Sequence, residues 1–422
     1  MGIFLPFVAY TTNIVINFPF GEKQWLREID MPNRRDFLKA GAMIITGGML
    51  LNGGVNVMAA EKKFPKMYES WEIDNLPLKN RMVASAMFEF AAENGKIDER
   101  VLERYDELAR GGAGLIITGM EGISPTACIG PVMIQTGYDG YEDDMRKIAD
   151  IVHGHGAKLF VQLNHAGYKT NWKNGGDKFG VCERKVSDDC TYRQATKDDI
   201  RKVIDAFAQS ATRCKAAGCD GVEIHYAHGF LLNTFLSPYF NHRTDEYGGN
   251  RENRARLPLE VYDAIRGKVG NDFIVAAKIP FSDLVEPSIS PEDCVWTCKE
   301  LEKRGLDMLE VTSGISYDGG ASSFTPYANV GKPQGKFLAG AEKIADNVTI
   351  PVVSVCGYRT PEFVENVLQE DKIAAIAFGR PFVREPNLPN RWLTDASPAK
   401  CISCNGCYTS KGIISCVFNR KG

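Results

Sequence analysis

Four cysteines near the carboxyl end of the chain have a spacing that suits a metal or cluster site. Cys401, Cys404, Cys407 and Cys416 read C-x2-C-x2-C-x8-C. Thiolates this close in sequence bind an iron–sulfur cluster, bind a zinc ion, or pair as disulfides. The spacing alone leaves all three possibilities open, so the rest of the chain must decide between them.

A second set of reactive side chains lies in the middle of the chain. His225 and His228 are three residues apart, Gln162 begins the run QLNHAG, and Lys278 interrupts an apolar run. Two histidines on an irregular turn can bind an oxyanion together. A buried lysine can place a positive charge against an anionic ring, and a glutamine amide can hydrogen-bond to the edge of a heterocycle. These groups act together only if the fold brings them to one place.

The middle of the chain alternates apolar, β-branched-rich runs with amphipathic helical stretches. Eight strands joined by crossover helices predict an α/β fold, a (β/α)8 TIM barrel with a short C-terminal four-cysteine segment. A doubly wound sheet is the rival, but it needs a glycine-rich turn after its first strand, and residues 86–89 read AMFE. The predicted strands are Met82–Met87, Gly114–Gly119, Lys158–Asn164, Gly221–Ala227, Phe273–Pro280, Met308–Gly314, Pro351–Cys356 and Ala374–Arg380, and the predicted helices are Glu99–Arg110, Asp143–His153, Asp198–Ala217, Asn253–Val269, Pro291–Arg304 and Pro361–Gln369.

In such a barrel the chemistry gathers at the carboxyl ends of the strands. The last two predicted strands end in glycines, where backbone N–H groups can approach a phosphate. The predicted ends carry Ala86, Met87, Gly119, Met120, Gln162, Asn164, His165, His225, His228, Lys278, residues 313–317, Cys356, Gly357, Gly379 and Arg380.

The amino-terminal part of the chain reads as an export signal. Residues 33–39, NRRDFLK, form a twin-arginine motif, and an apolar, glycine-rich stretch follows over residues 40–57. That stretch is short for a membrane span and ends in Ala59 and Ala60, so we predict a Tat-type signal cleaved near these residues and a periplasmic or cell-surface location. An uncleaved membrane anchor is the alternative. Residues 1–30 have no evident role, and Met31 is a possible start.

Composition fits a globular enzyme. The 422 residues carry a net charge of -3, and nothing in the charge pattern indicates a nucleic-acid partner. We predict an N-terminal extension with the signal peptide over residues 1–60, a barrel over 61–395 and a cysteine-rich segment over 396–422. Of the twelve cysteines, Cys182 and Cys190 lie in one polar loop and could pair in an oxidising compartment.

Several motifs resemble the Old Yellow Enzyme, or NADH:flavin oxidoreductase, family. They are LKNR from Leu78, QLNHAG from Gln162, the run HYAHGFLLNTFLSPYFNHRTDEYGGNRENRAR from His225, PVVSVCGYRTPE from Pro351 and FGRPFVREPNLPNRW from Phe378. The resemblance extends from about residue 64 onward. It implies a (β/α)8 barrel that binds FMN at the carboxyl ends of its strands.

Carried over residue by residue, the resemblance assigns roles in binding. In the family, hydride passes from flavin N5 to the β-carbon of an activated alkene, and an acid protonates the α-carbon. The resemblance implies that Ala86, Met87, Met120 and Gln162 contact the flavin, that Lys278 lies near its N1, that Gly357, Gly379 and Arg380 hold its phosphate, and that His225 and His228 bind the substrate's carbonyl or carboxylate oxygen.

The cysteine tail resembles the iron–sulfur branch that includes 2,4-dienoyl-CoA reductase and trimethylamine dehydrogenase. This resemblance favours a [4Fe–4S] cluster over zinc and disulfides. The x2–x2 spacing of the first three cysteines matches trimethylamine dehydrogenase, whereas the gap to Cys416 is shorter than in either relative. Those relatives continue into a nucleotide-binding region, and this chain stops six residues after Cys416, so we expect neither a second flavin nor an NAD(P)H domain.

The chain departs from the family pattern at three positions. Phe230 stands where the family has its usual proton-donor tyrosine, and Tyr168 stands where an arginine is common. Phe88 stands where the family has Cys or Thr near flavin N5, the position that forms the cysteinyl-flavin link in trimethylamine dehydrogenase. We therefore expect FMN to be held non-covalently. Tyr317 is the substitute candidate for the acid, because a phenol can donate a proton when a cation stabilises the phenolate. An ordinary loop tyrosine is an equal alternative.

The sequence thus predicts an exported, FMN-dependent oxidoreductase that reduces an activated C=C bond of an enoate, enone or related compound. Electrons would come from a redox partner, such as a cytochrome or quinol-linked donor, through the cluster. One alternative is a dehydrogenase that oxidises an amine-like donor, although such a site would want an aromatic cage where this chain has His225. Another is a flavoprotein that only relays electrons. The substrate, the donor and the oligomeric state stay open.

Overall fold

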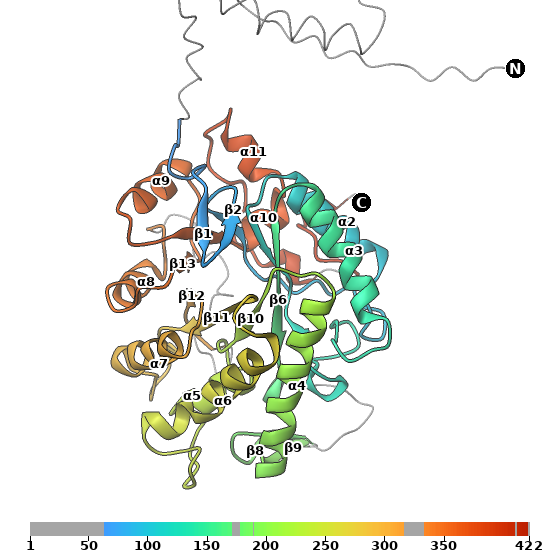
Figure 1. Ribbon diagram of the computed structural model, residues 1–422, viewed down its shortest axis with the longest axis vertical. Coiled ribbons are helices and arrows are strands. Elements are labelled where there is room, and N and C mark those ends of the chain that lie inside the picture. The colour runs from blue at the N-terminus through green and yellow to red at the C-terminus, as the bar shows by residue number, and fades with distance from the viewer. Residues whose placement is uncertain (1–62, 171–177, 189, 316–332, 410–411, 421–422) are drawn as a thin grey trace, which may run out of the picture. The chain divides into compact units, whose positions relative to one another are not determined.

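Eight parallel strands close into a barrel at the centre of the described chain (Figure 1). The structure, a computed structural model, describes residues 63–170, 178–188, 190–315, 333–409 and 412–420. Each barrel strand pairs with the next one along the chain, and pairing of β10 with both β6 and β11 completes the ring. The predicted (β/α)8 barrel is confirmed. Its strands are β3 (Met82–Ala84), β4 (Leu115–Ile117), β6 (Lys158–Asn164), β10 (Gly221–His225), β11 (Ile274–Pro280), β12 (Met308–Thr312), β13 (Val352–Val355) and β14 (Ala375–Phe378).

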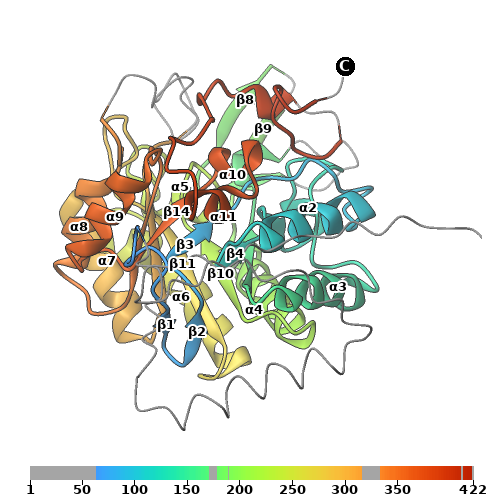
Figure 2. The ribbon, with the colours of Figure 1, turned by 90° about the horizontal axis from the view of Figure 1, so that it is seen from above.

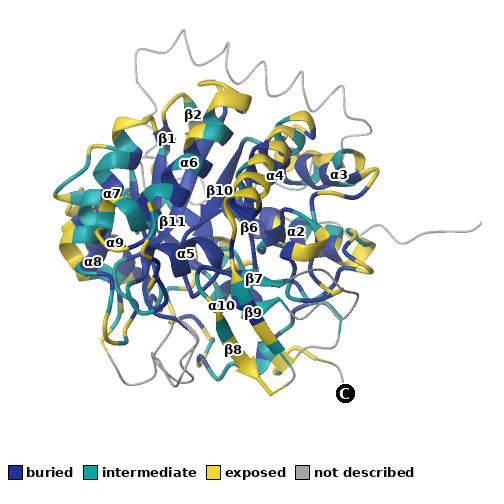
Figure 3. Cartoon of the chain, turned by 90° about the horizontal axis from the view of Figure 1, so that it is seen from below, coloured by how far each residue is buried: buried dark blue, intermediate teal, exposed yellow. Residues whose placement is uncertain are grey.

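Helices surround the barrel, with buried inner faces and exposed outer faces (Figure 3). All six predicted helices are present within two residues of their expected ends. Thr196 and Asp199 form a reciprocal capping box at the start of α4. The sequence analysis did not predict α8 or the short helices. The long helices are α2 (Glu99–Arg110), α3 (Tyr141–Gly154), α4 (Lys197–Ala216), α6 (Arg251–Val269), α7 (Pro291–Lys303), α8 (Leu338–Ala345) and α9 (Pro361–Gln369); the short ones are α5 (Leu231–Leu236), α10 (Arg380–Arg384), α11 (Leu388–Trp392), η1 (Pro125–Ala127), η2 (Gly167–Lys169) and η3 (Gly406–Thr409).

The strands divide their buried side chains between two cores, because successive residues of a strand point to opposite faces. On β4, Leu115 and Ile117 pack inside the barrel, whereas Ile116 packs outward against the helices. The hairpin of β1 (Trp71–Ile73) and β2 (Leu76–Leu78) contributes Trp71 to the inner core. The lower barrel is therefore filled by side chains, which leaves the carboxyl ends of the strands for a site.

Two additions to the barrel bear on the site. Along the chain, the segment between β6 and α4 forms a three-stranded sheet of β7 (Phe179–Gly180), β9 (Cys190–Gln194) and β8 (Arg184–Ser187). The short strand β5 (Glu121–Gly122) pairs with the end of β6. Seen from above, the C-terminal segment lies on the same side of the barrel as β8 and β9 (Figure 2). Within the described residues, no helix has the length and apolar character needed to cross a membrane.

Candidate active site

A pocket of about 970 Å³ lies at the carboxyl ends of the barrel strands. Every predicted cofactor residue and both predicted histidines line it, so the fold brings the predicted site together. Tyr317 lies outside the described residues. The predicted residues that line the pocket are Ala86, Met87, Met120, Gln162, His225, His228, Lys278, Gly357, Gly379 and Arg380; Ser85, Thr312 and Tyr408 also line it and were not predicted.

A buried network of charged groups underlies the pocket. The ammonium of Lys278 donates to Glu310 at 2.7 Å and to the hydroxyl of Ser85 at 2.9 Å, and Lys278 and Glu310 are almost completely buried. The amide of Gln162 donates to Glu223 on the neighbouring strand. Lys278 therefore does not present an isolated charge, because a carboxylate already faces it.

Burial and neighbouring charges set the protonation of this network. Burial, reinforced by the nearby Glu310, raises the pKa of Glu223 well above its usual range. Burial alone would lower the pKa of Lys278, but the charges of Glu310 and Glu223 outweigh it and raise that pKa. At neutral pH, the arrangement favours a protonated Glu223 beside a Lys278–Glu310 ion pair. The signal missed in the sequence was an acid inside each of two apolar strands, in GVEIH and MLEVT.

The two histidines form a directed hydrogen-bond chain. The N–H of Ala227 donates to Nδ1 of His225 at 3.2 Å, so the proton of this imidazole resides on Nε2. That Nε2 lies 3.3 Å from Nδ1 of His228, whose own Nε2 lies 2.9 Å from the hydroxyl of Thr312. Burial is the main cause that lowers the pKa of both histidines well below the usual range. Both imidazoles are therefore neutral, and a bound oxyanion would have to take over one of these N–H groups.

The opposite part of the pocket is shaped by close backbone approach. Gly357 has φ +94, and a Cβ on Gly379 would lie 2.8 Å from the sulfur of Met87. Arg380 is buried and donates to the carbonyl of Ser403 and to Asn405 at 2.7 Å. A cation beside two glycines after consecutive strands suits a phosphate, because the backbone there can approach the ligand.

The four C-terminal cysteines surround a smaller cavity of about 300 Å³ that adjoins the pocket. Cys401 and Arg380 line both spaces. The N–H of Ser403 points at the sulfur of Cys401 and the N–H of Gly406 at the sulfur of Cys404, both at 3.4 Å. Within the described ranges, no three His, Cys, Asp or Glu side chains have the spacing of a metal site. The thiols are thus gathered around one cavity without converging on a point.

All twelve cysteines are free thiols in the structure. The suggested pairing of Cys182 with Cys190 is therefore wrong, and so is the disulfide alternative for the C-terminal four. The sulfur of Cys182 instead accepts from the N–H of His242, and that of Cys190 accepts from Lys178. Each thiol of the suggested pair therefore has another partner.

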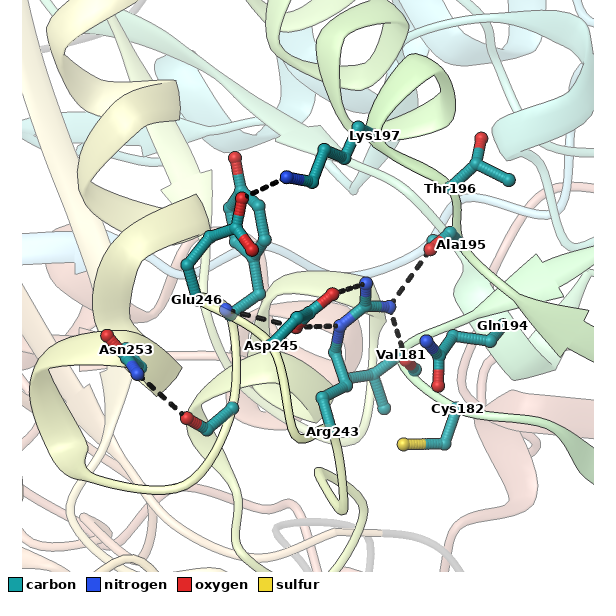
Figure 4. A network of polar contacts seen from close by, with 12 residues as sticks. Val181, Cys182, Gln194, Ala195, Thr196, Lys197, Arg243, Asp245, Glu246 and Asn253 are labelled. Atoms are coloured by element: carbon teal, nitrogen blue, oxygen red, sulfur yellow. Dashed lines mark hydrogen bonds and ion pairs between the residues drawn. The ribbon is translucent and has the colours of Figure 1, made fainter.

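The charged run that follows α5 holds the scaffold of the site rather than the pocket itself (Figure 4). Arg243 is 2% exposed, pairs with Asp245 at 2.6 Å, and donates to the carbonyls of Val181 and Ala195. These contacts fasten the β7–β9 sheet to the loop between α5 and α6. The charged residues Arg243 and Asp245 of this run therefore have a structural role, because they join two parts of the fold.

Comparison with known proteins agrees with this geometry. The sequence profile of the NADH:flavin oxidoreductase / NADH oxidase family matches residues 66–396. This chain belongs to that family. The motifs in the sequence predicted this family.

Individual relatives agree with the assignment. An NADH oxidase of Thermoanaerobacter brockii is 33% identical over 82% of this chain and 54% of its own length. An N,N-dimethylglycine/sarcosine dehydrogenase of Chromohalobacter salexigens is 31% identical over 82% of this chain and 51% of its own length. A cinnamate reductase of Clostridium sporogenes is 30% identical over 85% of this chain and 58% of its own length. The solved structure of a morphinone reductase superposes with a TM-score of 0.67 at 26% identity and covers 81% of this chain and 92% of its own. The chain spans about half the length of these curated relatives.

Proposed function

We propose that this protein is an FMN-dependent ene-reductase that reduces an activated C=C bond of an enoate, enone or related compound. The observation that carries the proposal is the single pocket that joins Gln162, Lys278, His225, His228 and the glycine–arginine end. A flavin bound there supplies a hydride. The same wall carries two histidines that can hold a carbonyl or carboxylate oxygen, which polarises the alkene for attack at its β-carbon.

The residues present fit FMN. Gly357 and Gly379 line the pocket beside Arg380, where their backbone can approach a phosphate, and Gln162 and Lys278 offer N–H donors from the pocket floor. Phe88 offers no thiol for a covalent link. Acid precipitation should therefore release a yellow supernatant with the mass of FMN. Flavin retained in the pellet, or FAD in the supernatant, would overturn this assignment.

Oxidation of an amine is the second candidate, and the name of the dimethylglycine/sarcosine dehydrogenase relative supports it. The pocket chemistry favours reduction instead. A cationic amine is usually held by an aromatic cage. Aromatic rings do line this pocket, but so do two neutral histidines and the cations Lys278 and Arg380, which would repel an amine cation. These groups suit an electron-rich oxygen better than a cation.

We also propose that the four cysteines hold a [4Fe–4S] cluster that passes electrons from a redox partner to the flavin. The arrangement of all four thiols around one space supports this. A zinc ion, with Zn–S bonds of about 2.3 Å, would draw four sulfurs to within about 4 Å of one another. The backbone N–H groups aimed at two of the sulfurs are typical of thiolates in clusters. The shared residue Cys401 supports a short path between the two sites.

A thiol variant tests the electron path. Cys404→Ala should lose iron and sulfide and should no longer accept electrons from a protein donor. Reduction of its flavin by a small dye should persist. Cys128→Ala, at a buried thiol away from the cavity, is the matched control. Zinc without iron in an anaerobic preparation would defeat the cluster assignment.

Export by the Tat route completes the proposal. Its support is the twin-arginine motif over residues 33–39, and the Tat route carries folded proteins with their cofactors inserted. Replacement of Arg34 and Arg35 with lysine should leave the precursor in the cytoplasm. An unchanged location on cell fractionation would show that the motif does not direct export.

A further inference from the structure

Lys169 lies next to the position where this chain lacks the family tyrosine. It ends η2, directly after the strand that carries Gln162. Its ammonium donates to the carbonyl of His228 at 2.6 Å and lies 4.5 Å from the ring centroid of Phe230. The Phe230 ring in turn lines the pocket and contacts His225, with 4.9 Å between centroids. The ammonium is therefore separated from the pocket wall by a single aromatic ring.

The described groups around the Phe230 ring have no readily released proton of their own. Phe230 carries none. His225 and His228 are neutral, and the N–H of each already faces a partner within the chain of hydrogen bonds. The other lysine of the site, Lys278, lines the pocket, but it donates to Glu310 and Ser85, and the charges of Glu310 and Glu223 raise its pKa.

Lys169, in contrast, is set up to exchange a proton near neutral pH. Burial lowers the pKa of Lys169 to about 8. Among the described residues, His225 and His228, at the end of β10 and in the turn after it, are titratable groups near Lys169. The closely packed α5 (LLNTFL) and β7 (Phe179–Gly180) carry no titratable side chain. An acid with a pKa near the working pH combines a sufficient protonated fraction with a sufficient driving force for transfer.

We propose that Lys169 is the proton donor that replaces the missing tyrosine and protonates the α-carbon of the reduced alkene. The proposal rests on the ene-reductase function. Hydride from the reduced flavin forms the new C–H bond at the β-carbon as the C=C π bond breaks. The electron pair of that bond takes a proton from Nζ of Lys169 at the α-carbon, and the neutral amine regains a proton from water. This step requires Nζ to leave the carbonyl of His228 and to pass the edge of the Phe230 ring, which the flexible four-carbon stem of a lysine allows.

Stopped-flow reoxidation of the dye-reduced holoenzyme by an enoate tests the step. Lys169→Met should slow this half-reaction by roughly 10²-fold or more, as expected for loss of a general acid. Flavin content and the rate of dye reduction should stay unchanged. The wild-type rate should fall above about pH 8, and this alkaline limb should vanish in Lys169→Met. Lys178→Met is the matched control, because Lys178 is a half-buried lysine in the same segment between β6 and α4. This variant should behave as wild type.

Two further variants separate acid catalysis from simple charge. Lys169→Arg keeps the cation but does not release a proton in this pH range, so it should stay slow; wild-type speed would overturn the acid role. The double variant Lys169→Met/Phe230→Tyr should recover part of the lost rate, because the phenol restores a donor. Absence of any recovery would contradict the proposed position of the donor.

Competitive acetylation of the native protein provides a readout that needs no variant and no turnover. The pH profile of Lys169 acetylation, followed by mass spectrometry, should have a midpoint near 8. A midpoint near 10.4, the value of an ordinary lysine, would overturn the proposal. If wild-type reduced enzyme is not reoxidised by any enoate or enone, the ene-reductase function itself fails. If wild type is reoxidised and Lys169→Met is equally fast, only the role of Lys169 fails.

Discussion

At the scale of single residues, the ion pair between Lys278 and Glu310 controls the charge beneath the pocket. The two side chains are 5% and 0% exposed, and their polar atoms lie 2.7 Å apart. A cation near a flavin stabilises its reduced, anionic form, and a carboxylate at this distance offsets that effect. The electrostatics of the site therefore depend on an acid that does not itself line the pocket.

Glu310→Gln tests this interpretation. Removal of the carboxylate leaves the charge of Lys278 uncompensated, so the two-electron potential of bound flavin should rise by roughly 30–60 mV, where 30 mV corresponds to about 1.4 kcal/mol. The measurement is a dye-equilibrated reductive titration. Glu121→Gln is the control, because Glu121 is buried against Tyr141 outside the pocket, where burial raises its pKa to about 8. A lower or unchanged potential in Glu310→Gln would contradict the account.

The histidine pair yields a second prediction at this scale. Replacement of both His225 and His228 with alanine should weaken the binding of a phenolate by roughly 1.5–3 kcal/mol for each charge-assisted hydrogen bond that is lost. FMN should remain bound, because the residues proposed to contact it come from other strands. Spectral titration of the bound flavin measures both the affinity for the phenolate and the amount of FMN that is retained. Equal affinity for the phenolate in parent and variant would show that the oxyanion binds elsewhere.

At the scale of secondary-structure elements, the barrel strands could be predicted from the sequence, whereas the small sheet of β7, β8 and β9 could not. Runs such as KLFVQLN are apolar and β-branched, so their position as β6 follows from the sequence. The strands β8 and β9 are largely polar and exposed, so no alternation marked them. The roles of Glu310 and Lys169 could not be predicted either, because their partners Lys278 and Phe230 belong to other elements. The pocket residues were predictable because each lies near the carboxyl end of a strand or follows one.

Arg243 yields the prediction at this scale. Its guanidinium joins Asp245 and two carbonyls between β7–β9 and the loop before α6, so Arg243→Met leaves buried acceptors without a donor. We expect a loss of roughly 3 kcal/mol in the free energy of unfolding, measured by urea titration. Arg251→Met removes an exposed pair with Glu252 and should cost less than about 1 kcal/mol. Equal midpoints for the two variants would contradict the fastening role of Arg243.

At the scale of the whole molecule, charge is unevenly distributed along the chain. Residues 380–422 contain seven Lys or Arg against two Asp or Glu, although the net charge of the chain is -3. Exposed Ile402 and Phe418 line the cysteine cavity within this basic segment. A donor that meets the cavity through an acidic surface would be attracted to this segment.

The rate of electron entry should therefore depend on salt. Reduction by an acidic one-electron carrier protein should slow as ionic strength rises from about 0.05 to 0.5 M, because salt screens exposed charges. Reduction by an uncharged dye should not change. A carrier rate that is flat or rises with salt would contradict docking at the basic segment while leaving the flavin site untouched.

The central claim, that this pocket passes a hydride to an activated alkene, is tested most directly by anaerobic reoxidation of the reduced flavin. The purified protein is reduced with one equivalent of dye, mixed with a panel of enoates and enones, and followed at the flavin absorbance. The account predicts return of the oxidised spectrum with one equivalent of saturated product for at least one compound. It is contradicted if no alkene reoxidises the flavin while an amine reduces the oxidised protein.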